Sequence, residues 1–279
     1  MIDLHMHSTF SDGSLTPEEL LVEAAQTGLS AIALTDHDTT GGLKRFFAAA
    51  KGGSVRAIAG VEISADFKPG TMHMLGYFIS AENGAFEERL RWIREGREIR
   101  NAEILAKLQA LGFELTWDEV KAYAGEDVVG RPHFAQALLA RGYVANKDEA
   151  FDKLLGKGKP AYADRRRLTP EDAVQLVVSA GGVAVLAHPF TLDLSADATR
   201  KLLSGLKDAG LAGIEVYYSE HNPDMVRLYE SMARDLDLVA TGGSDFHGAL
   251  APAIRMGKGF GGLSVPDEVV PALEARRPK

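Results

Sequence analysis

The chain has 279 residues, a formal net charge of −8 and no cysteine, and 46% of its residues are apolar while 25% are charged. This composition is that of an ordinary globular protein, and it excludes a chain that is disordered, collagen-like or coiled-coil throughout. The missing cysteine excludes disulfides, thiolate nucleophiles and cysteine-based metal sites, and the acidic balance argues against nonspecific coating of nucleic acid.

Residues 1–84 alternate short apolar runs with helical patterns. The apolar runs predict strands over residues 2–7, 31–35, 55–63 and 72–79. Thr16 can cap a helix that Pro17 favours at its first position and that ends at Gly28, and residues 41–50 predict a second helix. Alternation of this kind is typical of parallel strands that are covered by helices.

Residues 85–164 contain helical patterns and no convincing strand. They predict a long helix rich in Arg and Glu over 85–111 and two further helices over 132–140 and 147–155. Thr116 caps another short helix, with Glu119 completing a capping box. We therefore predict an all-helical insertion at 85–164 that separates two parts of one barrel, residues 1–84 and 165–279.

The alternation of strands and helices returns in residues 165–279. Thr169-Pro170 begins a helix, and strands are predicted over 182–187, 213–217 and 238–241, with helices over 196–208, 223–235 and after Pro266. About seven strands with interleaved helices favour a parallel barrel over an open sheet. Neither a signal peptide nor a membrane-spanning pattern is present, so we expect a protein of the cytoplasm.

Histidine and carboxylate residues gather at the ends of the predicted strands. His5 and His7 are two positions apart on one strand, so both side chains point to the same side and can share a metal ion. Glu62 stands among apolar residues, where a carboxylate is rarely buried unless it is paired or bound to a metal. Asp245 and His247 repeat the spacing of the first pair after the last strand of the barrel.

Each of these residues has an ordinary structural explanation when it is taken alone. Asp12 fits a turn, and His73 fits a core histidine whose hydrogen bonds are satisfied. Together, nine such side chains would meet at one mouth of a barrel, where they would repel each other or stay unsatisfied without cations. The nine are His5, His7, Asp12, His37, Glu62, His73, His188, Asp245 and His247. One ion takes about four to six ligands, so the set predicts two or three divalent metal ions.

These motifs, in this order, resemble the PHP (polymerase and histidinol phosphatase) family. The resemblance is carried by Asp3-Leu4-His5-Met6-His7-Ser8-Thr9-Phe10-Ser11-Asp12-Gly13, Thr35-Asp36-His37-Asp38, Gly60-Val61-Glu62, His73, His188-Pro189 and Gly243-Ser244-Asp245-Phe246-His247-Gly248. It implies an α/β fold, namely a distorted (β/α)7 TIM-like barrel, and a metal-dependent phosphoesterase activity.

The resemblance also implies how the ligands divide between the ions. One ion would be held by His5, His7, Glu62 and Asp245, a second by Glu62, His73 and His188, and a third by Asp12, His37 and His247. Several family members have His in place of Asp12, and an oxygen ligand there favours Mn, Mg or Fe over Zn. We expect manganese, with Mg, Fe or Zn as alternatives. Glu62, Asp245 and His188 would be catalytic.

The helical insertion resembles that of PHP enzymes that act on 3',5'-nucleoside bisphosphates. The match lies in Val129-Gly130-Arg131-Pro132-His133 and Lys157-Gly158-Lys159-Pro160-Ala161-Tyr162. It implies that the substrate is bound by Arg131, His133, Lys157 and Lys159. Arg131 can hold a phosphate bidentately, although Gly130-Arg131-Pro132 also fits a plain helix start. His221 follows a barrel strand and can contact substrate or protonate the leaving group, but a surface histidine is an almost equally good interpretation.

From these residues we expect hydrolysis of the 3'-phosphate of 3',5'-nucleoside bisphosphates to nucleoside 5'-monophosphate and phosphate. The alternative is a 5'-to-3' exonuclease on short RNA or DNA, because relatives with this insertion also trim short RNA. Histidinol phosphate is a weaker substrate option, and a binding module without turnover is the interpretation from a different class. The expected partners are small phosphorylated nucleotides or short oligonucleotides, without a membrane or an obligate protein partner.

Overall fold

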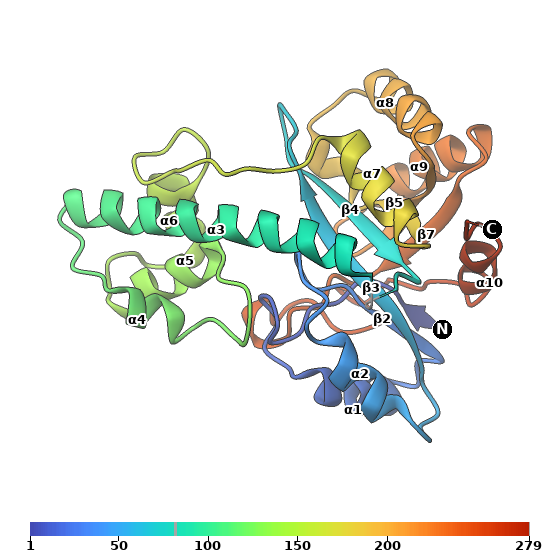
Figure 1. Ribbon diagram of the computed structural model, residues 1–279, viewed down its shortest axis with the longest axis horizontal. Coiled ribbons are helices and arrows are strands. Elements are labelled where there is room, and N and C mark those ends of the chain that lie inside the picture. Colours follow the sequence, from blue (N-terminus) through green and yellow to red (C-terminus); the bar gives the residue numbers. More distant parts are fainter. Residues whose placement is uncertain (81–82, 279) are drawn as a thin grey trace.

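A sheet of seven strands forms the barrel part of the computed structural model, which describes residues 1–80 and 83–278 (Figure 1). In chain order and in spatial order the strands are β1 (Ile2–Asp3), β2 (Ala31–Leu34), β3 (Arg56–Ala65), β4 (Met72–Tyr77), β5 (Val183–Leu186), β6 (Leu211–Tyr218) and β7 (Val239–Gly243). After β1, the Leu4 N–H donates to the Gly242 carbonyl at 3.3 Å, and Met6 forms a parallel bridge with Phe246. These contacts nearly close the sheet, which confirms the predicted barrel class.

The fourth strand departs from the parallel barrel that the sequence predicts. β4 pairs antiparallel with both β3 and β5, whereas β1–β2, β2–β3, β5–β6 and β6–β7 are parallel pairs. Only residues 66–71 separate β3 from β4. A parallel return needs a crossover of a dozen or more residues, so the prediction of parallel strands throughout is wrong at β4.

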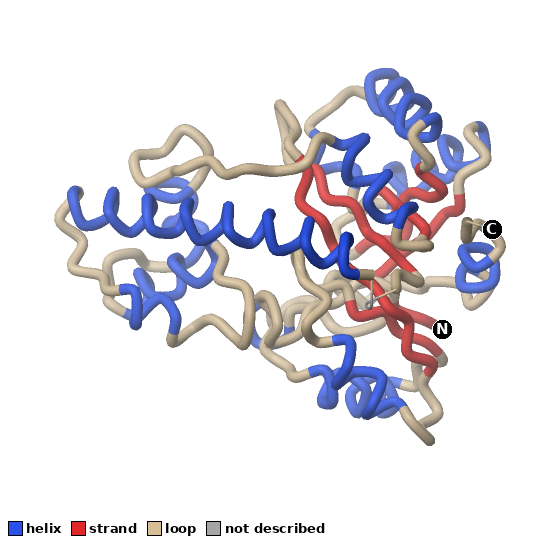
Figure 2. The backbone as a smooth tube through the Cα atoms, in the orientation of Figure 1, coloured by secondary structure: helices blue, strands red, loops and turns tan. Residues whose placement is uncertain are grey.

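The strands bury apolar side chains on both of their faces. On the outer face, Ile32 and Leu34 pack with residues of the surrounding helices, which Figure 2 shows around the strands. These helices are α1 (Pro17–Thr27), α2 (Leu43–Ala50), α7 (Pro170–Ser179), α8 (Ala196–Asp208) and α9 (Pro223–Asp235). On the inner face, Ala33 and Val185 pack in a second cluster that α10 (Val269–Glu274) completes. Because apolar side chains fill the barrel interior, polar chemistry is confined to its ends.

A block of helices projects from the barrel between β4 and β5 (Figure 1). It contains α3 (Gly84–Ala110), α4 (Trp117–Lys121), α5 (Arg131–Ala140) and α6 (Lys147–Ala150), and α6 continues into a wider π-helical turn, Phe151–Leu155. A separate apolar cluster around Ile104, Phe134 and Leu155 stabilises the block. This cluster supports the predicted helical insertion, whose boundaries at 85 and 164 stay a prediction.

The block is tied to loops at the carboxyl ends of the strands. Lys157 Nζ donates to the Pro69 carbonyl in the β3–β4 turn at 3.0 Å, and Lys147 Nζ donates to the Leu250 carbonyl after β7 at 3.0 Å. The block therefore stands beside the mouth of the barrel. None of the helices among the described residues is long and apolar enough to cross a membrane.

Candidate active site

All nine predicted metal ligands meet at the mouth of the barrel, and Glu62 of β3 lies at their centre. Its Oε2 atom lies 3.3 Å from His5 Nε2, 3.2 Å from His7 Nε2 and 3.0 Å from His37 Nδ1. Its Oε1 atom lies 2.8 Å from His73 Nδ1. His73 reaches this mouth because the antiparallel β4 begins where the parallel strands end, opposite Ser64 in the register.

The remaining ligands surround the same centre. His188 Nε2 lies 3.0 Å from Glu62 Oε1, and Asp245 Oδ1 lies 3.1 Å from His7 Nε2. Asp12 Oδ1 lies 3.3 Å from His247 Nε2. Three groups have ligand atoms within 4.8 Å of one another: His5, His7, Glu62 and Asp245; His37, Glu62 and His73; and His7, Asp12, His37 and His247. The first group is the set that the resemblance implies for one ion, and the others overlap the two further sets.

Most of the ligand atoms of this cluster lack hydrogen-bond partners among the described residues. Ten buried side-chain nitrogen or oxygen atoms among the described residues have no hydrogen-bond partner, and seven of them belong to the nine residues. The seven are His5 Nε2, His7 Nε2, Asp12 Oδ1, His37 Nδ1, Glu62 Oε2, His73 Nδ1 and Asp245 Oδ1. Buried polar atoms without partners are rare in native proteins. Imidazole nitrogens and carboxylate oxygens are ligands for divalent transition metals, so the residues fit bound metal ions.

Burial and neighbouring charges shift the pKa values of these groups in opposite directions. Burial lowers the pKa of His7, but the carboxylates of Asp245 and Glu62 outweigh it and raise the pKa to about 10. Burial raises the pKa of Glu62, but the neighbouring histidines, led by His37, hold it well below the ordinary value. At His37 burial prevails and lowers the pKa to about 3. The low pKa values of Asp12, Glu62 and Asp245 keep these carboxylates ionised, so they attract positive charge, which protonated histidines or metal ions can supply.

Glu215 of β6 contacts the cluster on the side of the barrel interior, and no motif of the sequence had indicated this residue. This side chain is fully buried, its Oε1 lies 3.0 Å from His5 Nδ1, and its Oε2 accepts a hydrogen bond from the His188 backbone N–H at 2.8 Å. A carboxylate that holds the second nitrogen of a histidine orients the ring toward a metal. The available signal was a charged residue inside an apolar strand, the same signal that indicated Glu62.

Two more buried carboxylates hold the loops that carry the ligands. Asp3 accepts hydrogen bonds from the Ser244 N–H at 2.8 Å and the Gly257 N–H at 2.7 Å. Asp36 accepts hydrogen bonds from the Ser8 N–H at 2.8 Å and from Ser11 Oγ at 2.6 Å. Both aspartates belong to motifs that resemble the PHP family, and their contacts show that these motifs contain structural supports as well as candidate ligands.

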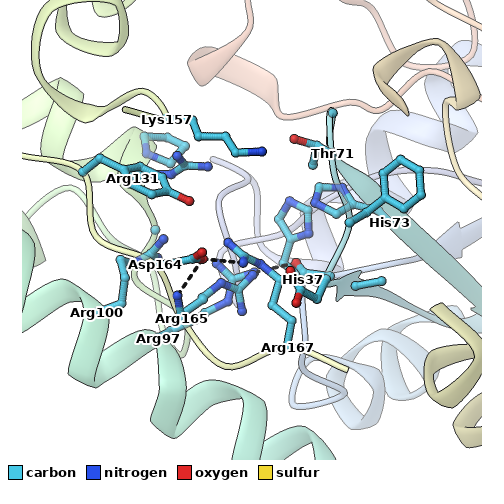
Figure 3. A pocket seen from close by; sticks show the side chains of 18 of the residues that line it. His37, Thr71, His73, Arg97, Arg100, Arg131, Lys157, Asp164, Arg165 and Arg167 are labelled. Atoms are coloured by element: carbon cyan, nitrogen blue, oxygen red, sulfur yellow. Dashed lines mark hydrogen bonds and ion pairs between the residues drawn. The ribbon is translucent and has the colours of Figure 1, made fainter. Parts of the chain in front are cut away.

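A cavity of about 350 Å³ adjoins the cluster and is rich in cations (Figure 3). It shares Asp12, His37 and His73 with the cluster. Its cationic lining residues are Lys68, Arg97, Arg100, Arg131, Lys157, Arg165 and Arg167, and we call it the arginine cavity. The acids among its described lining residues are Asp12, Asp66 and Asp164. The excess of positive charge favours an anionic ligand.

The arginines of this cavity are only partly paired. Arg97 Nε donates to Asp38 Oδ2 at 2.7 Å, and Arg165 donates to the same atom at 3.2 Å. Arg100 is 3% exposed, and its Nη2 has no partner among the described residues. Burial, followed by repulsion from Arg97, lowers the pKa of Arg165 to about 9, and burial likewise lowers the pKa of Arg100. A bound anion would relieve this repulsion.

The predicted substrate-binding residues differ in their position relative to the arginine cavity. Arg131 and Lys157 line the arginine cavity, and the Arg131 guanidinium lies 5.7 Å from the centre of the Tyr162 ring. His133 is buried, its Nδ1 accepts from the Gly130 N–H at 2.9 Å, and its Nε2 has no partner among the described residues. Lys159 is exposed and does not line the cavity, so the structure gives its predicted role no support.

His221 lies outside the cluster of candidate ligands, and its role in substrate contact or leaving-group protonation stays a prediction. Its Nδ1 donates to the Val216 carbonyl at 2.8 Å, and its ring lies 5.2 Å from the Tyr218 ring. Burial lowers the pKa of His221, so the ring is neutral at pH 7. It lines a second cavity together with Phe260, and this cavity does not contain the predicted metal ligands.

Comparison with known proteins agrees with this arrangement. The model of the PHP domain family matches residues 3–156. The chain belongs to the PHP family. A 3',5'-nucleoside bisphosphate phosphatase of Chromobacterium violaceum is 38% identical over 88% of this chain and 87% of its own length. A 5'-3' exoribonuclease of Haemophilus influenzae is 34% identical over 98% of this chain and 97% of its own length.

A solved structure has the same fold over the whole length of this chain. A protein of Bifidobacterium adolescentis that is classed as a metal-dependent phosphoesterase superposes with a TM-score of 0.88 and 30% identity, over 100% of this chain and 96% of that chain. The chain is therefore a metal-dependent phosphoesterase of the PHP family, which confirms the predicted family and the predicted class of enzyme.

This PHP protein also has site residues that no motif indicated. Arg97 and Arg100 belong to α3, whose sequence predicts only a long helix rich in Arg and Glu. Arg165 and Arg167 lie in the segment that follows the insertion, and no motif assigned them to the site. The apolar pattern of α3 does not show which of its arginines are buried, because their partners come from segments far away in the chain.

Proposed function

We propose that this PHP phosphoesterase hydrolyses the 3'-phosphate of 3',5'-nucleoside bisphosphates to nucleoside 5'-monophosphate and phosphate. The observation that carries the proposal is the arginine cavity beside the candidate metal cluster. A bisphosphate needs one place where a phosphate reacts and another where a phosphate is only bound. The two adjoining sites, which share His37 and His73, meet both needs. The name of the Chromobacterium violaceum relative supports the same substrate.

The metal ions would be held in the sets that the resemblance implies. These are His5, His7, Glu62 and Asp245; Glu62, His73 and His188; and Asp12, His37 and His247, with His7 beside the last set. Two or three divalent ions, with manganese expected, would supply a water nucleophile at neutral pH and would offset the charge of the phosphoryl group. We further propose a cytoplasmic location.

The residues of the chain orient this centre and the reacting phosphate. Glu62 joins two ligand sets because its two oxygens face different histidines. Tyr218 Oη donates to Asp245 Oδ2 at 2.9 Å and so turns Oδ1 toward His5 and His7. The oxygen of water becomes bonded to phosphorus, the bond between phosphorus and the 3' oxygen breaks, and the 3' oxygen takes up a proton. A covalent phospho-enzyme is not required.

The arginine cavity would bind the 5'-phosphate and thereby place the 3'-phosphate at the cluster. Arg100 has a donor without a partner among the described residues, and bidentate arginine contacts bind phosphate strongly. His133 Nδ1 accepts a hydrogen bond, so the ring proton is on Nε2, but this buried ring is not among the residues that line the arginine cavity. The Arg100 donor therefore supports the predicted involvement of the insertion in substrate binding, whereas the role of His133 stays a prediction.

The test compares substrates with and without a 5'-phosphate. In a phosphate-release assay supplemented with Mn²⁺, we expect adenosine 3',5'-bisphosphate to be preferred over adenosine 3'-monophosphate and histidinol phosphate. Arg100→Met should raise KM for the bisphosphate about tenfold to hundredfold, because a charge-assisted hydrogen bond contributes roughly 1.5–3 kcal/mol. The same substitution should leave KM for the 3'-monophosphate nearly unchanged.

Arg91→Met is the matched control, because Arg91 lies on the same helix but is an exposed residue. It should leave KM for both substrates unchanged. Preference for histidinol phosphate, or an equal effect of Arg100→Met on both adenosine substrates, would contradict the proposal. The second candidate function is 5'-to-3' cleavage of short oligonucleotides, which the name of the Haemophilus influenzae relative favours.

A further inference from the structure

A cavity of about 500 Å³ beside the mouth of the barrel has no part in the function proposed so far. It is lined by aromatic side chains that include Tyr217, Tyr218, His221 and Phe260, and we call it the aromatic cavity. We propose that it is a subsite for the base of the nucleotide that follows the scissile bond in a 5'-phosphorylated oligonucleotide. This inference rests on the proposed function, because the arginine cavity sets the direction in which the substrate lies.

The aromatic cavity and the arginine cavity lie on different sides of the cluster. The arginine cavity is built from the β3–β4 turn and the helical block, whereas the aromatic cavity is built from the end of β6 and the segment after β7. Because the strands follow chain order around the barrel, these elements face each other across the mouth. A third cavity lies between them. It shares His37 and His73 with the arginine cavity and Tyr218 with the aromatic cavity.

The chemistry of cleavage determines which nucleotide reaches the aromatic cavity. With the 5'-phosphate among the arginines, the 3'-phosphorus of the same nucleotide lies at the cluster. In an oligonucleotide this phosphorus also carries the 5' oxygen of the next nucleotide. Water adds to phosphorus, the bond to the 3' oxygen breaks, and that oxygen takes a proton, while the phosphate stays on the next nucleotide. This is the same bond that breaks in the bisphosphate, and the next nucleotide must extend away from the arginines.

The lining of the aromatic cavity suits a nucleobase. The Tyr218 ring lies 5.2 Å from the His221 ring, and the Phe190 ring, which lines the adjoining third cavity, lies 5.8 Å from the Tyr218 ring. Phe260 is 57% exposed and lies between Gly259 and Gly261. Aromatic side chains of this kind stack with bases irrespective of sequence. A ligand of this class also explains why a large apolar ring remains exposed near the mouth.

The polar groups of the cavity agree with this ligand. Its described lining residues include no Asp or Glu, and the cationic side chain among them is Arg227, which is paired with Asp224 outside the cavity. His221 Nδ1 carries the proton that is donated to the Val216 carbonyl, so Nε2 is an acceptor, and it has no partner among the described residues. An amino group of a base would satisfy that acceptor. This assigns His221 to substrate contact, although not to the reacting phosphate.

The test measures kcat/KM for a 5'-phosphorylated adenosine dinucleotide and for adenosine 3',5'-bisphosphate, with Mn²⁺ present. Phe260→Ala should lower the ratio of the first value to the second about tenfold, because stacking of one base contributes roughly 1–3 kcal/mol. With the unaltered protein, a dinucleotide whose second residue is abasic should have a kcat/KM about tenfold lower than the complete dinucleotide. Phe260→Ala should not lower kcat/KM for this abasic dinucleotide any further. Phe47→Ala, which removes another exposed phenylalanine on α2, should leave the ratio unchanged.

The outcomes separate this inference from the proposed function. If Phe260→Ala changes the ratio less than twofold, or if the unaltered protein hydrolyses the bisphosphate and not the dinucleotide, the subsite is wrong and the proposed function stands. If the dinucleotide is cleaved with the expected dependence on Phe260 while the bisphosphate is not hydrolysed, the subsite stands and the proposed function is wrong.

Discussion

Replacing Glu215 by glutamine tests whether this buried carboxylate controls the candidate metal centre. Glu215 Oε1 lies 3.0 Å from His5 Nδ1, and its Oε2 accepts from the His188 N–H at 2.8 Å. If His5 presents Nε2 to a metal, its Nδ1 carries a proton, so both partners of Glu215 are donors. A glutamine has one accepting oxygen, and its amide NH2 must then face one of the two donors.

The size of the effect follows from these two hydrogen bonds. Loss of one charge-assisted hydrogen bond costs about 1.5–3 kcal/mol. An outer partner of a metal-binding histidine typically contributes a factor of about 10–100 in metal affinity, and each tenfold corresponds to about 1.4 kcal/mol. The two figures agree, so we expect Glu215→Gln to weaken Mn²⁺ binding about 10–100-fold and to lower phosphate release when Mn²⁺ is limiting.

The assay is a competition titration of Mn²⁺ against a chelator, with urea unfolding of the metal-free protein to show that the fold persists. Glu230→Gln is the matched control, because the Glu230 carboxylate also accepts a hydrogen bond, from Tyr217 at 3.0 Å, but lies away from the cluster. A Glu215→Gln protein that binds Mn²⁺ within threefold of the unaltered protein would refute the reasoning.

Three further predictions concern the same region. Glu62→Gln should lower the rate of phosphate release by at least about a hundredfold, which is more than the typical effect of replacing a residue that only hydrogen-bonds a metal ligand. A variant that keeps its bound metal and most of its activity would contradict the proposed ligand sets. Asp38→Asn deprives the buried side chains of Arg97 and Arg165 of their carboxylate. It should lower the free energy of unfolding by about 3 kcal/mol in urea titrations, and a loss below about 1 kcal/mol would argue against a buried ion-pair network. Removal of metal by a chelator should lower the thermal midpoint in calorimetry, since an ion at a hundred times its Kd stabilises by about 2.7 kcal/mol, and unchanged midpoints would speak against bound metal.

The family, the barrel class and the set of candidate ligands could be predicted from the sequence because each depends on local pattern. A barrel brings the carboxyl ends of its parallel strands to one mouth, so His5, His37 and Asp245 converge once the strands are recognised. Glu62 is recognisable because a carboxylate in an apolar strand needs a partner. His73 is the exception, because it lies near the start of β4, and only the antiparallel direction of that strand brings it to the same mouth.

The arginine cavity, the role of Glu215 and the placement of His221 were decided by the tertiary structure alone. Arg100 and Arg165 are 65 positions apart and come together only where α3 passes the segment that leaves the helical block. Lys159 and Lys157 look equivalent in the sequence, yet only Lys157 lines the cavity. The period of a strand or helix determines the face on which a side chain stands, whereas the neighbour that it meets depends on the packing of distant elements. The sequence alone therefore determined the kind of chemistry, and the packing decided what surrounds it.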